Sequence, residues 1–174
     1  NPIIKNIREI EKPVIAAVNG VAAGAGANLA LACDIVVASQ SANFIQAFSK
    51  IGLIPDSGGT YFLPRLIGLP KATAIMMTGE SVNAEKAEKM GMIYAVYKDT
   101  EFESKLLELV KFISEMPTKG LGYTKKLLNH SLNNSLEEQL DLEAEIQALS
   151  AKSEDHKEGI QAFLEKRPPV FTGK

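Results

Sequence analysis

An aspartate in an apolar, glycine-rich turn is the residue of this sequence best suited to acid–base chemistry. Only two acidic residues, Asp34 and Asp56, occur between positions 12 and 79, and Asp56 lies in the turn at residues 52–60. Because a carboxylate is costly to desolvate, we expect an acid in these surroundings to be buried and to be used in chemistry. A single carboxylate can move a carbon-bound proton if burial strengthens it as a base and another group stabilises the enolate.

A stretch of small residues at positions 20–26 is a candidate for that second group. Closely spaced glycines and alanines stand there between a predicted strand and a predicted helix. Such a backbone can approach a ligand closely, and free N–H groups point out of the start of the helix. Close packing of small residues explains the stretch equally well. Its spacing matches neither a dinucleotide-binding fingerprint nor a phosphate-binding P-loop.

Other roles for these residue types are open or disfavoured. Asp56 could cap a helix that begins near Ser57 or Gly58, and position alone makes this as good an interpretation as catalysis. Asp34 follows a predicted helix and precedes a strand, so we expect a structural turn acid. Ser57 lacks the Gly-X-Ser-X-Gly context of a serine nucleophile, and two histidines and one cysteine offer no metal-ligand cluster.

Composition indicates one ordinary globular domain. The chain has 174 residues, 45% of them hydrophobic and 23% charged, with a formal net charge of −2. Basic residues are spread along the chain, so no nucleic-acid partner is expected. Glycines and asparagines interrupt the longest apolar run, at residues 14–32, and no signal peptide is evident, so we expect a cytoplasmic protein without membrane contact. Cys33 is expected to be a small buried hydrophobe in a reducing compartment.

The order of the predicted elements favours an α/β fold. Short β-branched runs predict strands at residues 14–18, 35–38, 42–46 and 93–97. Helical spacing and cap signals predict helices at residues 26–33, 60–67, 71–78, 84–90, 101–116, 118–130, 135–150 and 155–167. We therefore expect an α/β core in residues 1–98 and a helical region in residues 99–174 that packs on the core or on a neighbouring subunit.

Several segments together resemble the crotonase (enoyl-CoA hydratase/isomerase) superfamily. They are residues 12–26, 31–35, 52–60, 62–65, 84–91 and 159–167. The resemblance implies a spiral of ββα units with a C-terminal helical region, and assembly as a homotrimer or a dimer of trimers. It also implies an acyl-CoA thioester substrate, whose oxygen two backbone N–H groups hold, and no cofactor beyond that coenzyme A. One donor maps onto Ala25, beside Gly24 at the substrate, and we expect the other to lie in an N-terminal segment absent from this chain.

The resemblance also assigns roles to single positions. Hydratases of the family use two glutamates, and the matching residues here are Asn28 and Phe48, neither of which can act as a general base. Asp56 matches the acid of several isomerases and the nucleophile of aryl-CoA dehalogenases. Phe163 and Lys166 match positions that in relatives contact the CoA adenine and phosphates from an adjacent subunit. Packing of Phe163 in a core, with Lys166 solvated, is the favoured alternative for that pair.

An acyl-CoA isomerase is therefore the first hypothesis, most similar to the bacterial phenylacetate-degradation isomerase branch. In it, Asp56 takes a proton from the α carbon of the thioester, the Ala25 N–H helps to hold the enolate oxygen, and Asp56 returns the proton at the γ carbon. Asn28 and Phe48 would shape a dry pocket. The alternatives are an atypical hydratase, an enzyme with Asp56 as nucleophile, and a truncated crotonase-like subunit that assembles without turnover.

Overall fold

The computed structural model describes residues 1–174 as two compact units. The first unit comprises Asn1–Arg8 and Val14–Leu109, and the second comprises Glu9–Pro13 and Val110–Lys174. The boundary falls inside helix α6 (Phe102–Ser114). Nowhere in the chain does a helix combine the length and the hydropathy that crossing a membrane requires.

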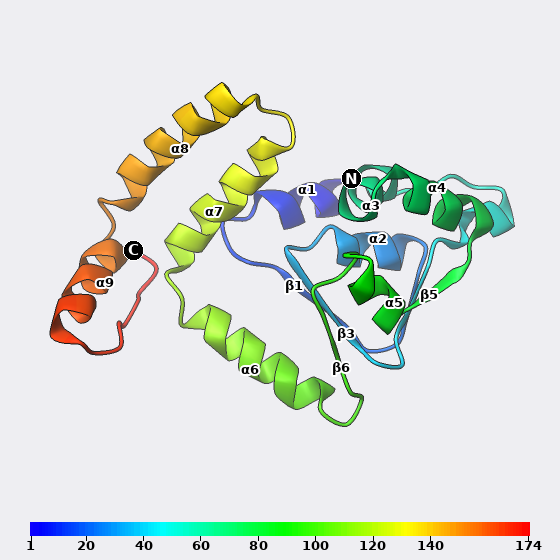
Figure 1. Ribbon diagram of the computed structural model, residues 1–174, viewed down its shortest axis with the longest axis horizontal. Coiled ribbons are helices and arrows are strands. Elements are labelled where there is room, and N and C mark those ends of the chain that lie inside the picture. The colour runs from blue at the N-terminus through cyan, green and yellow to red at the C-terminus, as the bar shows by residue number, and fades with distance from the viewer. The chain divides into compact units, whose positions relative to one another are not determined.

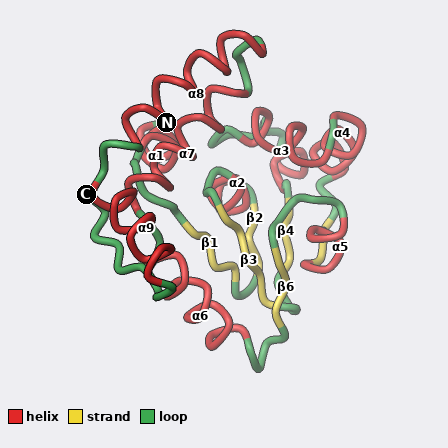
Figure 2. The backbone as a smooth tube through the Cα atoms, turned by 60° about the vertical axis from the view of Figure 1, so that its left-hand side comes forward, coloured by secondary structure: helices red, strands yellow, loops and turns green.

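Two small sheets organise the first unit (Figure 2). One is entirely parallel, in the order β1-β3-β6, and in the other β4 pairs parallel with β2 and antiparallel with β5. The units β1-β2-α2 and β3-β4-α3 each give their first strand to one sheet and their second strand to the other, in keeping with the expected spiral. The strands are β1 (Ile15–Val18), β2 (Val21–Ala23), β3 (Ile35–Ser39), β4 (Asn43–Ile45), β5 (Ser81–Asn83) and β6 (Ala95–Tyr97).

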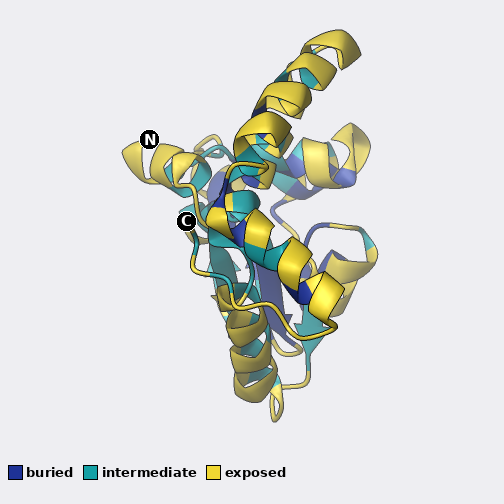
Figure 3. Ribbon diagram, turned by 90° about the vertical axis from the view of Figure 1, so that its left-hand side faces the viewer, coloured by how far each residue is buried: buried dark blue, intermediate teal, exposed yellow.

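Short helices cover these sheets and close a hydrophobic core. Alanine-rich α2 buries Ala27, Ala30 and Leu31, and α3 buries Leu63 and Ile67. Full burial of an aliphatic side chain such as Leu63 contributes about 1.5–3 kcal/mol. Figure 3 shows the buried residues gathered around the strands. The helices of this unit are α1 (Pro2–Glu9), α2 (Ala25–Leu31), η1 (Ala47–Ile51, a 3-10 helix), α3 (Gly59–Ile67), α4 (Leu69–Thr78) and α5 (Ala84–Lys89).

All the predicted elements of the first unit form, together with four further elements that were not predicted. These are α1, η1, β2 and β5. The two strands have three residues each, too few for a period to be visible, and β2 lies inside the small-residue stretch. Helix α1 is amphipathic, with Ile4 and Ile7 half-buried on one face, and this pattern was not used in the sequence analysis.

Asp34 is the structural turn acid that its position predicts. Its carboxylate accepts hydrogen bonds from the Arg8 guanidinium at 3.1 Å and from the Val14 N–H at 2.8 Å. These contacts fix the turn between α2 and β3 against α1 and the start of β1. The neighbouring Cys33 is half-buried rather than buried as expected, and its thiol donates to the Leu29 carbonyl.

The second unit is helical, as its periodicity predicts. Helices α7 and α8 run side by side in Figure 1 and contact each other. Ser135 and Glu138 form a capping box at the start of α8, with both reciprocal hydrogen bonds present. Most of the surface of these helices is exposed. They are α7 (Thr118–Ser131), α8 (Leu136–Ser150) and α9 (Glu154–Glu165).

Candidate active site

The Asp56 turn is a tight reversal at the entry to α3. The Asp56 carbonyl accepts a hydrogen bond from the Gly59 N–H at 2.8 Å, and both residues between them have positive φ, 49° at Ser57 and 77° at Gly58. This is the pattern of a type I′ turn. A left-handed conformation costs roughly 1–2 kcal/mol for a residue other than glycine. At Ser57 the surrounding contacts therefore have to hold this strain.

Asp56 does not cap α3, so the capping interpretation is wrong. Helix α3 begins at Gly59, its N-cap residue is Gly58, and no side chain caps it. The carboxylate of Asp56 makes no hydrogen bond or ion pair within the chain, and the residue is exposed. The expectation that Asp56 is buried is therefore also wrong for this chain.

Buried Asn28 ties the Asp56 turn to helix α2. Its side-chain Nδ2 donates to the Asp56 carbonyl at 2.9 Å, and its Oδ1 accepts from Gln46 Nε2 at 2.7 Å. Asn28 has no exposed surface, and Gln46 is 1% exposed. The amide of Asn28 therefore positions the turn through internal hydrogen bonds instead of lining an open pocket.

The glycine–alanine stretch leaves a free donor at the start of α2. Gly24 has φ 53° and ψ −123°, a combination that glycine adopts without strain, and α2 begins at the next residue, Ala25. The Gly24 N–H donates to the Ile45 carbonyl at 2.8 Å, whereas the Ala25 N–H has no partner within the chain. The first N–H groups of a helix lack intrahelical acceptors, so Ala25 presents an N–H that can bind an oxyanion.

Phe48 lies against this donor loop. It is buried, with 7% exposure, and a Cβ placed on Gly24 would be 3.6 Å from its ring. Phe48 is thus brought together with Gly24, Ala25 and, through Asn28, the Asp56 turn. An apolar ring at this place cannot activate water.

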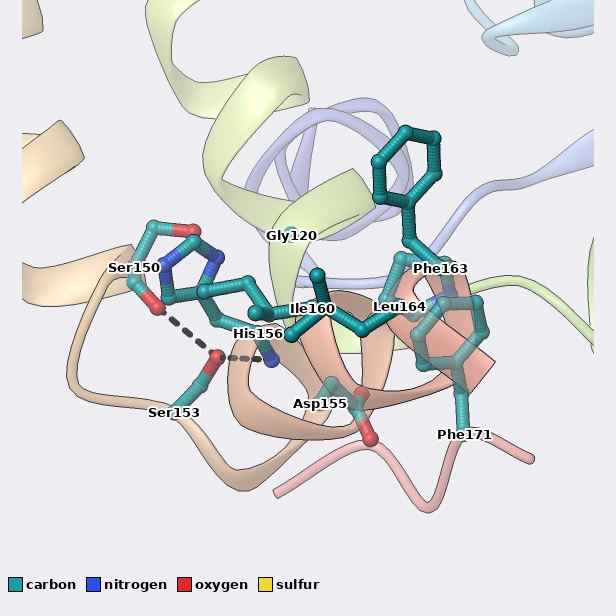
Figure 4. A pocket seen from close by; sticks show the side chains of 11 residues that line it. Gly120, Ser150, Ser153, Asp155, His156, Ile160, Phe163, Leu164 and Phe171 are labelled. Atoms are coloured by element: carbon teal, nitrogen blue, oxygen red, sulfur yellow. Dashed lines mark hydrogen bonds between the residues drawn. The ribbon is translucent and has the colours of Figure 1, made fainter. Parts of the chain in front are cut away.

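The remaining two predicted site residues lie on α9 in the second unit. Phe163 is 83% exposed, which contradicts the interpretation that it packs in a core. Lys166 follows α9 as its C-cap, with a left-handed φ of 54°. Figure 4 draws the Phe163 ring projecting away from Ile160 and Phe171, at a pocket of about 460 Å³ that these residues line.

The C-terminal tail is fastened next to that pocket by two carboxylates of α9. Asp155, which is buried, accepts from the N–H groups of Thr172 and Gly173. Glu158 accepts two hydrogen bonds from Arg167, at 2.6 and 2.9 Å, and one from the Val170 N–H at 2.8 Å. The segment after α9 is therefore held by defined contacts.

Acid should release the Glu158 contact in a predictable window. The hydrogen bonds from Arg167, followed by that from the Val170 N–H, hold the pKa of Glu158 at about 2, below its ordinary 4.5. Because the folded-state pKa is lowered, the stabilisation is complete above about 4.5 and is lost as the pH falls toward about 2. Urea unfolding should show Glu158→Gln less stable than wild type at neutral pH, with a difference that shrinks in this window.

The matched control for that measurement is Glu145→Gln, at an exposed position of α8 without a partner in the chain. It should track the wild type at every pH. A Glu158→Gln difference that stays constant down to the lowest pH at which the chain is folded would contradict the assignment.

Two residues of the site escaped sequence analysis. Gln46 follows β4 directly, and the only hint of a role in the sequence is that a long amide side chain stands there among apolar residues. Gly59 is the other, because a Cβ there would lie 2.6 Å from Asn28 Cγ. No group of three or more His, Cys, Asp or Glu side chains is arranged to hold a metal ion.

A fold in which successive ββα units share their strands between two sheets defines a class of proteins. The family model described as enoyl-CoA hydratase/isomerase matches residues 1–174, and the chain belongs to this family. The predicted membership of the crotonase superfamily is thereby confirmed.

Individual relatives carry both isomerase and hydratase names. The chain is 48% identical over 174 residues to 1,2-epoxyphenylacetyl-CoA isomerase of Escherichia coli (strain K12), covering 100% of this chain and 66% of that protein. It is 47% identical over 173 residues to a probable enoyl-CoA hydratase of Rhodobacter capsulatus, covering 99% and 67%. An enoyl-CoA hydratase structure from Polaromonas sp. JS666 superposes with a TM-score of 0.92 at 37% identity, covering 97% and 66%. The chain thus spans about two thirds of the length of these relatives.

Proposed function

We propose that this chain carries the acid–base half of an acyl-CoA isomerase site. The Asp56 carboxylate takes a proton from the α carbon of a 3-enoyl thioester, and the C–H electron pair moves into an enolate whose oxygen accepts from the Ala25 N–H. The enolate is conjugated with the 3-ene double bond. When it collapses, its electrons form the bond between the γ carbon and the proton that Asp56 returns, and the double bond then lies between the α and β carbons, at the 2-position. Atoms and charge balance without a cofactor or metal.

The observation that carries the proposal is the state of the two positions where hydratases have glutamates. Asn28 is an amide with Oδ1 and Nδ2 both engaged by neighbours, and Phe48 is an apolar ring packed on Gly24. Neither can orient and deprotonate water. The Asp56 carboxylate, by contrast, is free of partners in the chain.

Exposure of Asp56 means that water has to be removed when substrate binds. We propose that the thioester, together with a neighbouring chain in a homotrimer or dimer of trimers, covers this carboxylate and strengthens it as a base. In the same assembly, exposed Phe163 and Lys166 would contact the adenine and phosphates of CoA bound to an adjacent subunit. Phenylacetate catabolism in the cytoplasm is the setting that this proposal implies.

Isotope transfer distinguishes the reactions. The full-length protein is incubated with 3-enoyl-CoA and 2-enoyl-CoA thioesters in heavy water, and the products are analysed by mass spectrometry and NMR. Double-bond migration without added water is the expected result, with deuterium at the γ carbon where protonated Asp56 exchanges with the solvent before it returns the proton, and at the α carbon where the first step reverses after that exchange. Failure of the double bond to migrate would contradict the isomerase.

Hydration is the second candidate, because one relative at 47% identity is named a probable hydratase. A 3-hydroxyacyl product carrying oxygen from labelled water would favour it. Assembly without turnover or thioester binding would favour a non-catalytic subunit.

A further inference from the structure

Gln46 is the buried residue whose chemistry the proposed reaction leaves unexplained. It follows β4 directly and is the N-cap residue of η1, with no side-chain capping bond. Its Oε1 is buried without a hydrogen-bond partner, and it is the one buried side-chain oxygen or nitrogen in the chain in this state. An unpaired buried acceptor is unfavourable, so some compensating role is expected.

The direction of the amide hydrogen bonds follows from one group that can only accept. The Asp56 carbonyl has no proton to give, so Asn28 must face it with Nδ2, at 2.9 Å. Oδ1 of Asn28 then faces Gln46, which must offer its own Nε2, at 2.7 Å. Rotating either amide would bring two acceptors together. The orphaned Oε1 is therefore a consequence of holding Asp56, not an arbitrary assignment.

The same strand end also holds the donor side of the site. The Ile45 carbonyl, one residue before Gln46, accepts from the Gly24 N–H at 2.8 Å, directly before Ala25. Two adjacent residues, Ile45 at the end of β4 and Gln46 directly after it, thus fix both the helix start that presents the oxyanion donor and the turn that presents the carboxylate.

We infer that Gln46 is a positioning residue, which orients Asn28 and thereby sets the place of Asp56 relative to the Ala25 N–H. This rests on the proposed function only for its catalytic consequence. The hydrogen-bond relay from Gln46 through Asn28 to the Asp56 carbonyl can be tested without a substrate.

Two variants separate positioning from bulk stability. Gln46→Met removes the unpaired Gln46 Oε1 but leaves Asn28 Oδ1 without its donor, so one unpaired buried acceptor replaces another and the unfolding midpoint should stay near that of wild type. Amide hydrogen exchange at Gly59, whose N–H closes the Asp56 turn, should nevertheless become faster. Displacement of a catalytic group can lower the rate about 10²-fold. We expect a loss of this order in kcat with little change in KM.

Gln46→Glu adds a pH signature that a packing role lacks. The ionised carboxylate cannot donate to Asn28, so Asn28 turns its Nδ2 toward residue 46 and releases the Asp56 carbonyl. The protonated form can donate and restore the relay. Burial raises the pKa of a glutamate to as much as about 8–9. The ratio of variant kcat to wild-type kcat should therefore rise as the pH falls from about 9 to about 6, because the glutamate becomes protonated.

Charges around position 46 do not confound that ratio. The adjoining β2 and β5 and helix α2 carry no titratable residue. The charged residues on the other neighbouring segments are Asp56, Lys50 in η1, Lys71 in α4, Glu80 after Gly79, and Glu85, Lys86, Glu88 and Lys89 in α5. All of them are present in wild type and variant alike. Gln147→Glu, at an exposed position of α8, is the matched control and should give a pH-independent ratio near one.

Wild-type Gly59 exchange and wild-type kcat in Gln46→Met would overturn the inference. If that variant does not fold, the isosteric Gln46→Glu decides, and a flat ratio across the pH range overturns it. If the wild type isomerises no thioester, the proposed function fails separately, and the Gly59 exchange still tests the relay.

Discussion

Asp56→Asn should strongly slow proton exchange and double-bond migration in the full-length protein. An amide has the shape of the carboxylate but cannot accept the α proton, and positioned acid–base catalysis is worth about 10²–10⁴-fold in rate. We expect kcat to fall within this range. Since the carboxylate has no partner within the chain, folding should be unaffected.

Thermal unfolding and thioester binding of Asp56→Asn therefore serve as internal controls, and both should match the wild type. Asp141→Asn, at an exposed position of α8, makes the same chemical change away from the site and should retain full activity. Migration at the wild-type rate in Asp56→Asn would exclude Asp56 as the base. Persistent hydration in the same variant would point to the hydratase alternative.

Gly59→Ala should damage both stability and activity. The added Cβ would lie 2.6 Å from Asn28 Cγ and 2.7 Å from Asn28 Oδ1, and Asn28 is fully buried and bonded at both ends. Overpacking of this kind typically costs about 1–3 kcal/mol. Displacing Asn28 also releases the Asp56 carbonyl, so we expect a further loss of about 10²-fold in kcat. Urea unfolding and the isomerisation assay measure the two effects.

Gly120→Ala is the matched control for this substitution. Gly120 lies in α7, where a Cβ would make only ordinary contacts with Pro117 at 3.8 Å and beyond. Replacing a helical glycine with alanine stabilises by roughly 0.5–1 kcal/mol. A Gly59→Ala variant that behaved like Gly120→Ala would mean that Asn28 can move freely and does not hold the turn.

The sequence predicted the architecture well because its signals are local. Apolar periodicity and caps, such as Asn83 at the start of α5, mark the long elements, and Asn83 indeed accepts from the Lys86 N–H. The resemblance added the spiral order of the strands. Three-residue strands such as β2 were missed, because pairing across the sheet, not their own pattern, makes them strands.

Prediction of the site was less complete for a physical reason. Asp56 and Ala25 were identified by residue type and position, but burial of Asp56 depends on what covers it in space, and in this chain it is exposed. Asn28 was expected to line a pocket, whereas its buried amide is hydrogen-bonded to the Asp56 carbonyl and to Gln46. Gln46 and Gly59 matter only through contacts across 18 residues and through the absence of a side chain, respectively, and neither leaves a local signature.

The position of β4 has a mechanical consequence. Ile45 and Gln46 are consecutive, and through them one strand end anchors both the Gly24 loop and, by way of Asn28, the Asp56 turn. When that strand end moves, the Ala25 N–H, which binds the oxyanion, and the Asp56 carboxylate, which carries the proton, move together. The distance between the Ala25 N–H and the Asp56 carboxylate therefore changes little when the sheet moves.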